Sequence, residues 1–240
     1  MKICVAQTLA EKGNIKANIK NHLVWIERAL SRGADLIVFP ELSLTGYEPG
    51  LARDLATDSG DTRLGAFQDI SDRGQITIGC GLPITTPLGT MIGMVIFQPH
   101  GPPRVYGKQL LHLDELPYFV PGGEQLLLSV RGKKVAPAIC FESLQPAHVA
   151  RAMGLGGEIY LASVSKSNHG MAKAVDHFPH IAKKYGVPVL MANAIGPCDG
   201  FFCGGQSAVW NAQGKLLGQL QRDREGILIV DTRTDQVLGK

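Results

Sequence analysis

Three reactive side chains follow apolar, strand-like runs of the 240-residue sequence. Glu41 ends the run DLIVFP, Lys108 follows RVYG, and Cys140 ends KVAPAI. In open α/β sheets, ligands bind at the carboxyl ends of the strands, and Glu41 and Cys140 occupy that position, while Lys108, after the β-type segment, is a third candidate. A thiol, a carboxylate and an ammonium group together suit nucleophilic catalysis. In that chemistry a base takes the thiol proton, and a cation stabilises the charge that develops.

Each of the three residues also has a purely structural interpretation. Free cysteine is among the most buried residue types, so Cys140 taken alone could be an inert core thiol. Glu41 could cap the loop that follows it, and Lys108 could be a solvated surface charge. A nucleophilic cysteine needs a base or a cation, because free cysteine has a pKa of about 8.5. None of the seven histidines stands at the end of a clear apolar strand with an Asn or Asp beside it, so a Cys–His pair has weak support.

Strand-like and helix-like segments alternate along the chain, which is typical of an α/β fold. Apolar residues recur at helical spacing over residues 16–31, and the continuous apolar run 34–41 is typical of a strand buried on both faces. No low-complexity linker divides the chain, so we expect a single domain over residues 1–240. Further strands are predicted within 1–8, 75–84, 89–99, 102–108, 126–140, 158–165, 187–196, 206–220 and 225–232, and further helices within 61–74, 146–157 and 174–186, the last interrupted by Pro179.

Composition and charge narrow the classes of partner. Lys and Arg total 24 against 21 Asp and Glu, which gives a net charge of +3. The densest basic segments, 131–134 and 183–184, are short and lack neighbouring aromatic residues, so we expect no nucleic-acid partner. No run of about 18 apolar residues predicts a membrane span. The apolar part of the N-terminus is too short for a signal peptide, and we expect a cytoplasmic protein.

The five cysteines are an odd number, which fits free thiols in a reducing cytoplasm. Cys4 and Cys80 lie in apolar, strand-like runs and are expected in the core. Cys198 and Cys203 suggest a metal clip. However, two cysteines without a second pair of ligands make a poor zinc site, so no metal is expected.

The segments around the three reactive residues together resemble the nitrilase superfamily of carbon–nitrogen hydrolases. The matching segments are FPELSLTGYEP, YGKQLLHLDE and APAICFESLQP, in the order that the family shows. The opening KICVAQT resembles the first strand of the family. VPVLMANAIG and GGQSAVWNAQGKLLGQL resemble its closing strands. The resemblance therefore spans roughly residues 1–235, and three motifs in order are much more specific than one.

This resemblance implies a fold and a set of catalytic roles. The fold is an α/β, four-layer α-β-β-α sandwich, in which two sheets pack face to face with helices outside. The catalytic roles are general base for Glu41, oxyanion stabiliser for Lys108 and nucleophile for Cys140. No organic cofactor is expected. Self-association as a homodimer or larger homo-oligomer is common in the family and is expected here.

Two further carboxylates follow the motifs. The family has a second catalytic carboxylate shortly after the lysine, and Glu115 is its nearest match. The local spacing departs from the usual pattern, however, and Asp114 is adjacent. Glu142 matches a glutamate that is common after the family's cysteine, and we expect it to hold the strand end by pairing a cation. The backbone N–H of Phe141 is expected to help Lys108 bind the oxyanion.

The walls of the substrate pocket are predicted from the loops that follow the catalytic strands, because site-forming residues concentrate there. In the polar loop ASVSKSNHG, Lys166 or His169 could meet a carboxylate of the substrate, which would favour a small ω-amide acid. The predicted substrate-binding residues are Tyr47, Phe141, Ser165 and Asn168, with Tyr118 and Phe119 as further candidates.

The expected reaction is hydrolysis of a small amide through a cysteine thioester, with release of ammonia or an amine and a carboxylic acid. A nitrilase or an N-carbamoyl amidohydrolase would use the same three residues. A glutaminase domain that feeds a synthetase is less expected, because the chain ends soon after the sandwich and has no P-loop-like segment. A catalytically silent binding or scaffold member is the alternative outside enzymes.

Overall fold

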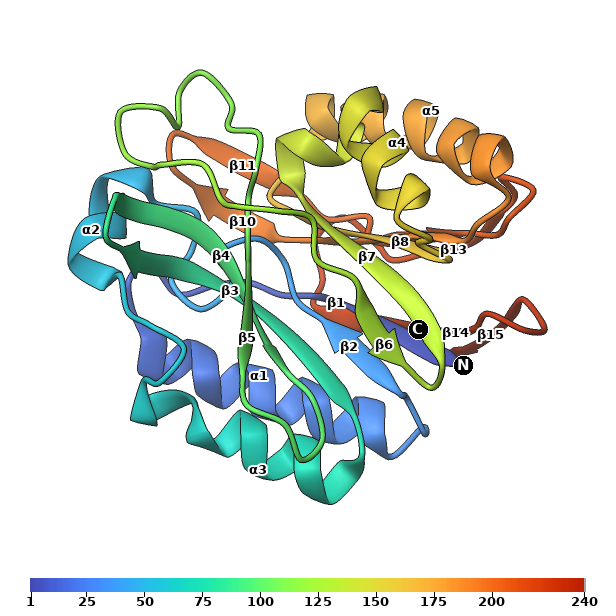
Figure 1. Ribbon diagram of the computed structural model, residues 1–240, viewed down its shortest axis with the longest axis horizontal. Helices are drawn as coiled ribbons and strands as arrows, with labels where there is room; N and C mark the ends of the chain where they lie inside the picture. The colour runs from blue at the N-terminus through green and yellow to red at the C-terminus, as the bar shows by residue number, and fades with distance from the viewer. Residues whose placement is uncertain (240) are drawn as a thin grey trace.

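The apolar runs of the sequence form two β-sheets that pack face to face, with helices on both outer sides (Figure 1). The computed structural model describes residues 1–239. One apolar cluster fills the space between the sheets, and two more lie between each sheet and its helices. The layers therefore run α-β-β-α, and the predicted sandwich is confirmed.

The first sheet has seven strands, of which three neighbours run parallel and the rest pair antiparallel. In spatial order they are β15 (Gln236–Gly239), β14 (Gly226–Asp231), β1 (Lys2–Gln7), β2 (Leu36–Val38), β3 (Thr77–Thr86), β4 (Gly89–Phe97) and β5 (Arg104–Gly107). The parallel strands β1, β2 and β3 are buried on both faces along most of their length, as expected for sheets covered on both sides.

The second sheet has six strands, and its central three run parallel. In spatial order they are β13 (Leu216–Gln219), β12 (Ala208–Trp210), β9 (Val189–Asn193), β8 (Ile159–Val164), β7 (Lys133–Ile139) and β6 (Leu128–Val130). A separate two-stranded hairpin consists of β10 (Ile195–Cys198) and β11 (Phe201–Gly204).

Helices cover the outer faces in two pairs, as Figure 1 shows. α1 (Ile15–Leu30) and α3 (Gly65–Gly74) cover the first sheet, and α4 (Pro146–Gly154) and α5 (Asn168–Tyr185) cover the second. The shorter elements are α2 (Ala52–Leu55) and the 3₁₀ helices η1 (Pro49–Leu51), η2 (Thr62–Leu64) and η3 (Cys140–Leu144). Among residues 1–239, no helix combines the length and the apolar character that crossing a membrane requires.

Two local predictions are wrong. The last helix begins earlier than expected, at Asn168, and it runs through Pro179 without interruption. Proline removes one helical hydrogen bond, but the buried face of α5, which includes Phe178 and Ile181, packs on the second sheet and holds the helix together. The expected pair of free thiols in the β10–β11 hairpin is instead a disulfide between Cys198 and Cys203, whose Cα atoms lie 6.4 Å apart. That separation is within the range that a disulfide requires.

The topology brings the ends of parallel strands from both sheets to one place. Glu41 follows β2, while Cys140 follows β7 and Ser165 follows β8. Two hydrogen bonds join these ends across the sandwich: the Ser163 hydroxyl donates to the Phe39 carbonyl at 2.8 Å, and the Ser165 hydroxyl donates to the Glu41 carbonyl at 3.1 Å. The candidate residues of the two sheets therefore face each other.

Candidate active site

A cavity of about 440 Å³ lies where the strand ends of the two sheets meet. Its wall combines charged, polar and aromatic side chains, which is typical of a small-molecule site. The lining residues are Tyr47, Lys108, His112, Asp114, Glu115, Cys140, Phe141, Leu144, Gln145, Ser165, Lys166, Ser167, Gly170, Lys173 and Phe201.

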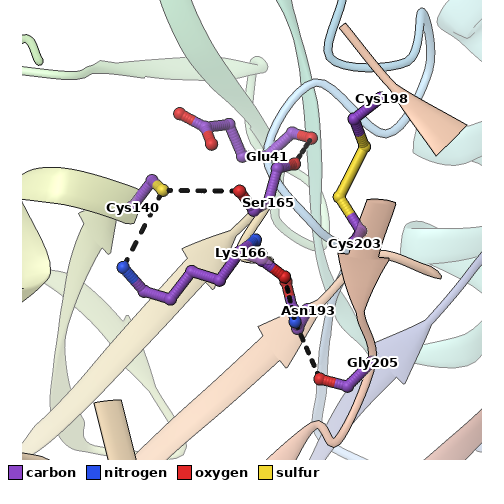
Figure 2. Close-up of a disulfide and its surroundings, with 8 residues drawn as sticks. All are labelled: Glu41, Cys140, Ser165, Lys166, Asn193, Cys198, Cys203 and Gly205. Carbon is purple, nitrogen blue, oxygen red and sulfur yellow. Dashed lines mark hydrogen bonds between the residues drawn. A yellow bond between two sulfur atoms is a disulfide. The ribbon is translucent and has the colours of Figure 1, made fainter. Parts of the chain in front are cut away.

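Cys140 occupies a sharp turn between β7 and η3. Its φ is +47°, in the left-handed region that non-glycine residues rarely adopt. Such backbone strain costs about 1–3 kcal/mol and clusters at active sites. In Figure 2 the sulfur lies between the side chains of Glu41 and Lys166, and it is 3.9 Å from the Lys166 Nζ atom.

The thiol of Cys140 is protonated at neutral pH. Burial raises its pKa, and the nearby charge of Glu41 raises it further, while Lys166 and Lys108 lower it; the resulting pKa is about 11. Because the thiolate is the reactive species, this cysteine needs a base beside it when it attacks.

Glu41 is fixed by a close approach of two backbones. A Cβ atom on Gly81 would lie 2.7 Å from the Pro40 carbonyl oxygen and 3.0 Å from the Glu41 carbonyl carbon, so only glycine lets β3 approach this segment. One carboxylate oxygen of Glu41 accepts a hydrogen bond from Lys108 Nζ at 2.7 Å. The other has no hydrogen-bond partner among residues 1–239, and the Cys140 thiol faces this carboxylate.

The electrostatics of Glu41 favour proton uptake. Burial raises the pKa of the carboxyl group above its usual 4.5, and the negative charge of Glu115 also raises it, while Lys108 opposes the shift. A carboxylate with a raised pKa can accept a proton and later return it, which a general base in acyl transfer must do.

Lys108 lies fully buried between two carboxylates. Its Nζ atom is 2.7 Å from Glu41 Oε1 and 2.5 Å from Glu115 Oε1. Burial disfavours the ammonium form, but the charges of Glu41, Cys140 and Glu115 outweigh it and raise the pKa of Lys108. This lysine is therefore a permanent cation in a water-excluded position, where a charge acts strongly on its neighbours.

Glu115, rather than Asp114, is the carboxylate at Lys108. It accepts hydrogen bonds from the Tyr47 hydroxyl at 2.9 Å and from the His112 backbone N–H at 2.7 Å. Asp114 is exposed at the mouth of the cavity and lies 2.6 Å from His112 Nδ1. The tight turn of residues 112–119 points one of the two neighbouring carboxylates inward and the other outward.

Glu142 does not pair a cation, contrary to the expectation from sequence. Its buried carboxylate accepts hydrogen bonds from one tyrosine hydroxyl and three backbone N–H groups. Among residues 1–239, the basic side chain within 4.0 Å of it is His148, whose Nε2 atom lies 3.6 Å from Oε1. Burial, together with the charge of Arg151, lowers the pKa of His148 to about 4, so this ring is neutral. Neutral donors satisfy this buried anion in place of a counter-ion.

The structure separates the predicted wall residues into two groups. Tyr47, Phe141 and Ser165 line the cavity, although the hydroxyls of Tyr47 and Ser165 are engaged with Glu115 and with the Glu41 backbone. Asn168 does not line it: this residue is exposed and lies against Gly204. Ser167 caps α5 by accepting from the Gly170 N–H, so Asn168 is the first residue of this helix. Three further candidates also lie outside the wall. Tyr118 is exposed, Phe119 is in the core, and His169 is not among the lining residues.

The β10–β11 hairpin supplies a wall residue that sequence reasoning missed. The Phe201 ring packs edge-on against Tyr47, with ring centroids 5.9 Å apart. The hairpin backbone also holds both sides of the cavity, because Asp199 N–H donates to the Tyr47 carbonyl at 3.0 Å and Gly204 N–H donates to the Lys166 carbonyl at 2.7 Å. The Cys198–Cys203 disulfide closes this hairpin beside the site (Figure 2).

Lys166 is a second buried cation in the cavity. It is 7% exposed, and within residues 1–239 no carboxylate lies within 4.0 Å of its Nζ atom. An unpaired buried charge is costly, so a residue of this kind needs an anionic partner. Lys173, at the rim of the same cavity, adds a further positive charge. No group of three or more His, Cys, Asp or Glu side chains in the described part of the chain is arranged to hold a metal ion.

Comparisons with known proteins identify a matching family and similar structures. The family model described as "Carbon-nitrogen hydrolase" matches residues 2–237. An amidase of Nesterenkonia sp. AN1 is similar in structure, with a TM-score of 0.87, 26% sequence identity, and coverage of 96% of this chain and 92% of the amidase. In one structure acrylamide is added to the active-site cysteine of that amidase, and in another a mutant binds butyramide.

Curated relatives include two kinds of enzyme. The glutamine-dependent NAD(+) synthetase of Thermotoga maritima is 28% identical over 99% of this chain and 43% of its own length. The chain thus spans about two fifths of the length of such synthetases. The omega-amidase YafV of Yersinia enterocolitica is 22% identical over 86% of this chain and 79% of its own length.

Proposed function

The chain belongs to the carbon–nitrogen hydrolase family, and we propose that it hydrolyses a small amide through a thioester on Cys140. One observation carries the proposal: a thiol and a buried ammonium group line a single cavity, and a buried carboxylate with a raised pKa lies 2.7 Å from that ammonium group and faces the thiol. The Cys140 thiol holds a proton at neutral pH, because its pKa is about 11, and the raised pKa of Lys108 keeps that side chain cationic.

In the first half-reaction the Cys140 sulfur attacks the amide carbon, and Glu41 takes the thiol proton. The carbonyl electrons move to oxygen, where Lys108 and the Phe141 N–H stabilise the negative charge. Phe141 lies in the first turn of η3, where helical N–H groups have no partner inside the helix. When the tetrahedral species collapses, the C–N bond breaks, and Glu41 gives its proton to the nitrogen, which leaves as ammonia.

In the second half-reaction Glu41 takes a proton from water, and the oxygen attacks the thioester carbon. Lys108 and the Phe141 N–H again stabilise the negative charge on the oxygen of the new tetrahedral species. It then collapses with loss of the Cys140 thiolate, which recovers the proton from Glu41. One amide and one water become one carboxylic acid and one ammonia, and the enzyme returns to its starting state.

We further propose that the substrate is an amide that carries a carboxylate, that is, a small ω-amide acid. Lys166 supports this choice, because a buried ammonium group beside the thiol lacks an acidic partner until such a substrate binds. Lys173 strengthens the positive field at the rim. The omega-amidase among the relatives agrees with the same substrate class.

Glutamine is a second candidate substrate, because it is itself a carboxylate-bearing amide. The glutamine-dependent NAD(+) synthetases among the relatives favour it. A nitrile or an N-carbamoyl amine would use the same cysteine chemistry with a different leaving group.

Ammonia release from a matched panel tests the proposal. The monoamide of succinic acid and butyramide have the same carbon chain and differ only in the carboxylate. We expect at least tenfold higher kcat/KM for the acid, and we expect Lys166→Met to remove that preference while butyramide turnover changes little. Equal rates on the two amides would overturn the carboxylate assignment.

Glutamine, butyronitrile and an N-carbamoyl amine complete the panel and identify the leaving group. Cys140→Ala should remain folded and lose all turnover, and intact mass should show the acyl group on Cys140 in the wild type. An adduct mapped to Cys80 would overturn the cysteine assignment. A wild-type protein without a selectively reactive thiol would identify a silent family member.

A further inference from the structure

We propose that Glu142 is a positioning residue that holds Lys108 and Cys140 at a fixed separation across the two sheets, an inference that rests on the function proposed above. Glu142 does not touch the cavity, and the reaction described above uses no proton from it. Its side chain is fully buried, so its contacts are its only means of acting on the reaction.

The two carboxylate oxygens of Glu142 bind the two catalytic segments separately. Oε1 accepts a hydrogen bond from the Ile139 N–H at 2.7 Å, and Ile139 directly precedes Cys140. Oε2 accepts from the Gln109 N–H at 2.6 Å and from the Leu110 N–H at 3.2 Å, and these two residues directly follow Lys108. One rigid carboxylate therefore fixes the backbone beside the nucleophile and the backbone beside the cation.

This link crosses the sandwich at a point where the two segments belong to different sheets. Lys108 follows β5, an edge strand of the first sheet, and Cys140 follows β7 of the second. Strands in one sheet are held by their hydrogen-bond ladder, but sheets packed face to face rely on side-chain contacts. Misplacement of a reacting group by about 1 Å can cost about 100-fold in rate, so a polar link across this interface has a direct catalytic value.

A buried network of uncharged polar side chains surrounds the link. The Tyr106 hydroxyl donates to Glu142 Oε1 at 2.6 Å, and its oxygen lies 2.9 Å from His148 Nε2. Because tyrosine has a single hydroxyl proton, neutral His148 must donate from Nε2, and its Nδ1 then accepts from the Tyr160 hydroxyl at 3.0 Å. The carboxylate is thus held by uncharged donors on every side.

Glu142→Gln tests the link with little change in shape. A glutamine side chain offers a single acceptor oxygen, so its NH₂ group must oppose either the Ile139 side or the Gln109–Leu110 side. We expect kcat on the best amide to fall about 100-fold while KM stays within about threefold. We also expect alkylation of Cys140 by iodoacetamide at pH 9 to slow about fivefold, because Lys108 then lowers the thiol pKa less.

Asp231→Asn is the matched control. Asp231 is also a buried carboxylate with several donors, among them the N-terminal amine and the Arg233 side chain, but it ends β14, at the other end of the first sheet's strand order from β5. This variant should lower the melting temperature and leave both kcat and the alkylation rate at the wild-type level.

The outcomes separate the link from the proposed function. Wild-type kcat and wild-type alkylation in Glu142→Gln would overturn the link, as would an equal loss of kcat in Asp231→Asn. If the wild type hydrolyses no amide, the proposed function fails, and the alkylation rates still decide the link.

If Glu142→Gln does not fold, Tyr106→Phe removes a single donor and should lower kcat about fivefold at constant KM. An unchanged kcat in that variant would also overturn the link.

Discussion

Replacement of Lys108 by methionine would leave two buried carboxylates without their cation. Lys108 Nζ lies 2.7 Å from Glu41 and 2.5 Å from Glu115, and all three side chains are almost completely buried. Methionine fills a similar volume, so the variant tests charge with little effect on packing. Loss of one partner from a buried ion pair costs about 3–5 kcal/mol, because the remaining charge is uncompensated.

A loss of this size in the free energy of unfolding corresponds to a large fall in the melting temperature. For a chain of this size, 1 kcal/mol lowers the melting temperature by about 2–4 °C. Lys108→Met should therefore melt about 6–20 °C below the wild type at pH 8. Amide turnover should be lost at the same time, because the oxyanion has lost its cation.

The destabilisation should be smaller in acid. The folded-state pKa of Glu41 is already raised above its usual 4.5, chiefly by burial. A carboxyl group with a raised folded pKa contributes stability below its unfolded pKa, and that stability is lost as the pH rises through the folded pKa. Without Lys108 the pKa of Glu41 rises further. The difference in the free energy of unfolding between wild type and variant should consequently be larger at pH 8 than at pH 5.

Thermal and urea unfolding at pH 5, 6.5 and 8 measure this gap. Lys133→Met is the control, because its ion pair with Glu158 is half exposed, and such pairs contribute little. The control should shift the melting temperature by less than about 4 °C. A Lys108→Met protein as stable as the wild type at pH 8, or a gap that narrows as the pH rises, would refute the electrostatic account of this site.

Three other predictions concern the backbone and the cysteines. Gly81→Ala should lower kcat at least tenfold and lower the melting temperature, because the new Cβ atom would press on the backbone of Pro40 and Glu41. Steady-state kinetics and thermal unfolding measure these two effects, and a fully active variant would contradict the close approach of the two backbones. Thiol titration in denaturant should give three thiols before reduction and five after it, since Cys198 and Cys203 are bonded; five thiols from the start would exclude the disulfide. The rate of Cys140 alkylation should keep rising up to about pH 11, and a plateau near pH 8.5 would contradict the raised thiol pKa.

The positions of Glu41 and Cys140 could be predicted because each ends an apolar strand-like run, and Lys108 follows a shorter strand-like segment. The gathering of the three does not follow from one parallel sheet, because Cys140 follows a strand of the second sheet and Lys108 follows the antiparallel edge strand β5; it depends on how the two sheets pack. The two sheets and the order of their strands could not be derived from alternation alone. They depended on the resemblance to a known family, because hydrophobic periodicity does not say which strands become neighbours.

The predictions that were wrong or left open concern side chains whose direction is set by a helix cap or a turn. Asn168 follows a strand that ends at the site, but the Ser167 cap starts a helix there and turns Asn168 to solvent. Glu115 and Asp114 are chemically alike, and only the turn that contains them determines which one meets Lys108. Tertiary packing sets such directions, and local sequence carries little information about them.

The hairpin that carries Phe201 did have a sequence signal. Asp199 and Gly200 form a two-residue turn between β10 and β11, and an Asp-Gly pair between strands is a strong hairpin indicator. The two cysteines around it drew attention to metal binding instead. A turn that brings residues five apart within disulfide distance explains the pair without any metal.

The arrangement of charges around Cys140 favours proton transfer during attack over a preformed thiolate. Two lysines lower the thiol pKa, but burial and the Glu41 carboxylate raise it more, so the resting group is a neutral thiol. The same burial raises the pKa of Glu41, which makes this carboxylate a stronger proton acceptor. In the proposed reaction the proton moves to Glu41 as the sulfur begins to bond to carbon. In the proposed reaction Lys108 stays cationic throughout and stabilises the oxygen, and this division of roles requires Lys108 and Cys140 to remain at a fixed separation.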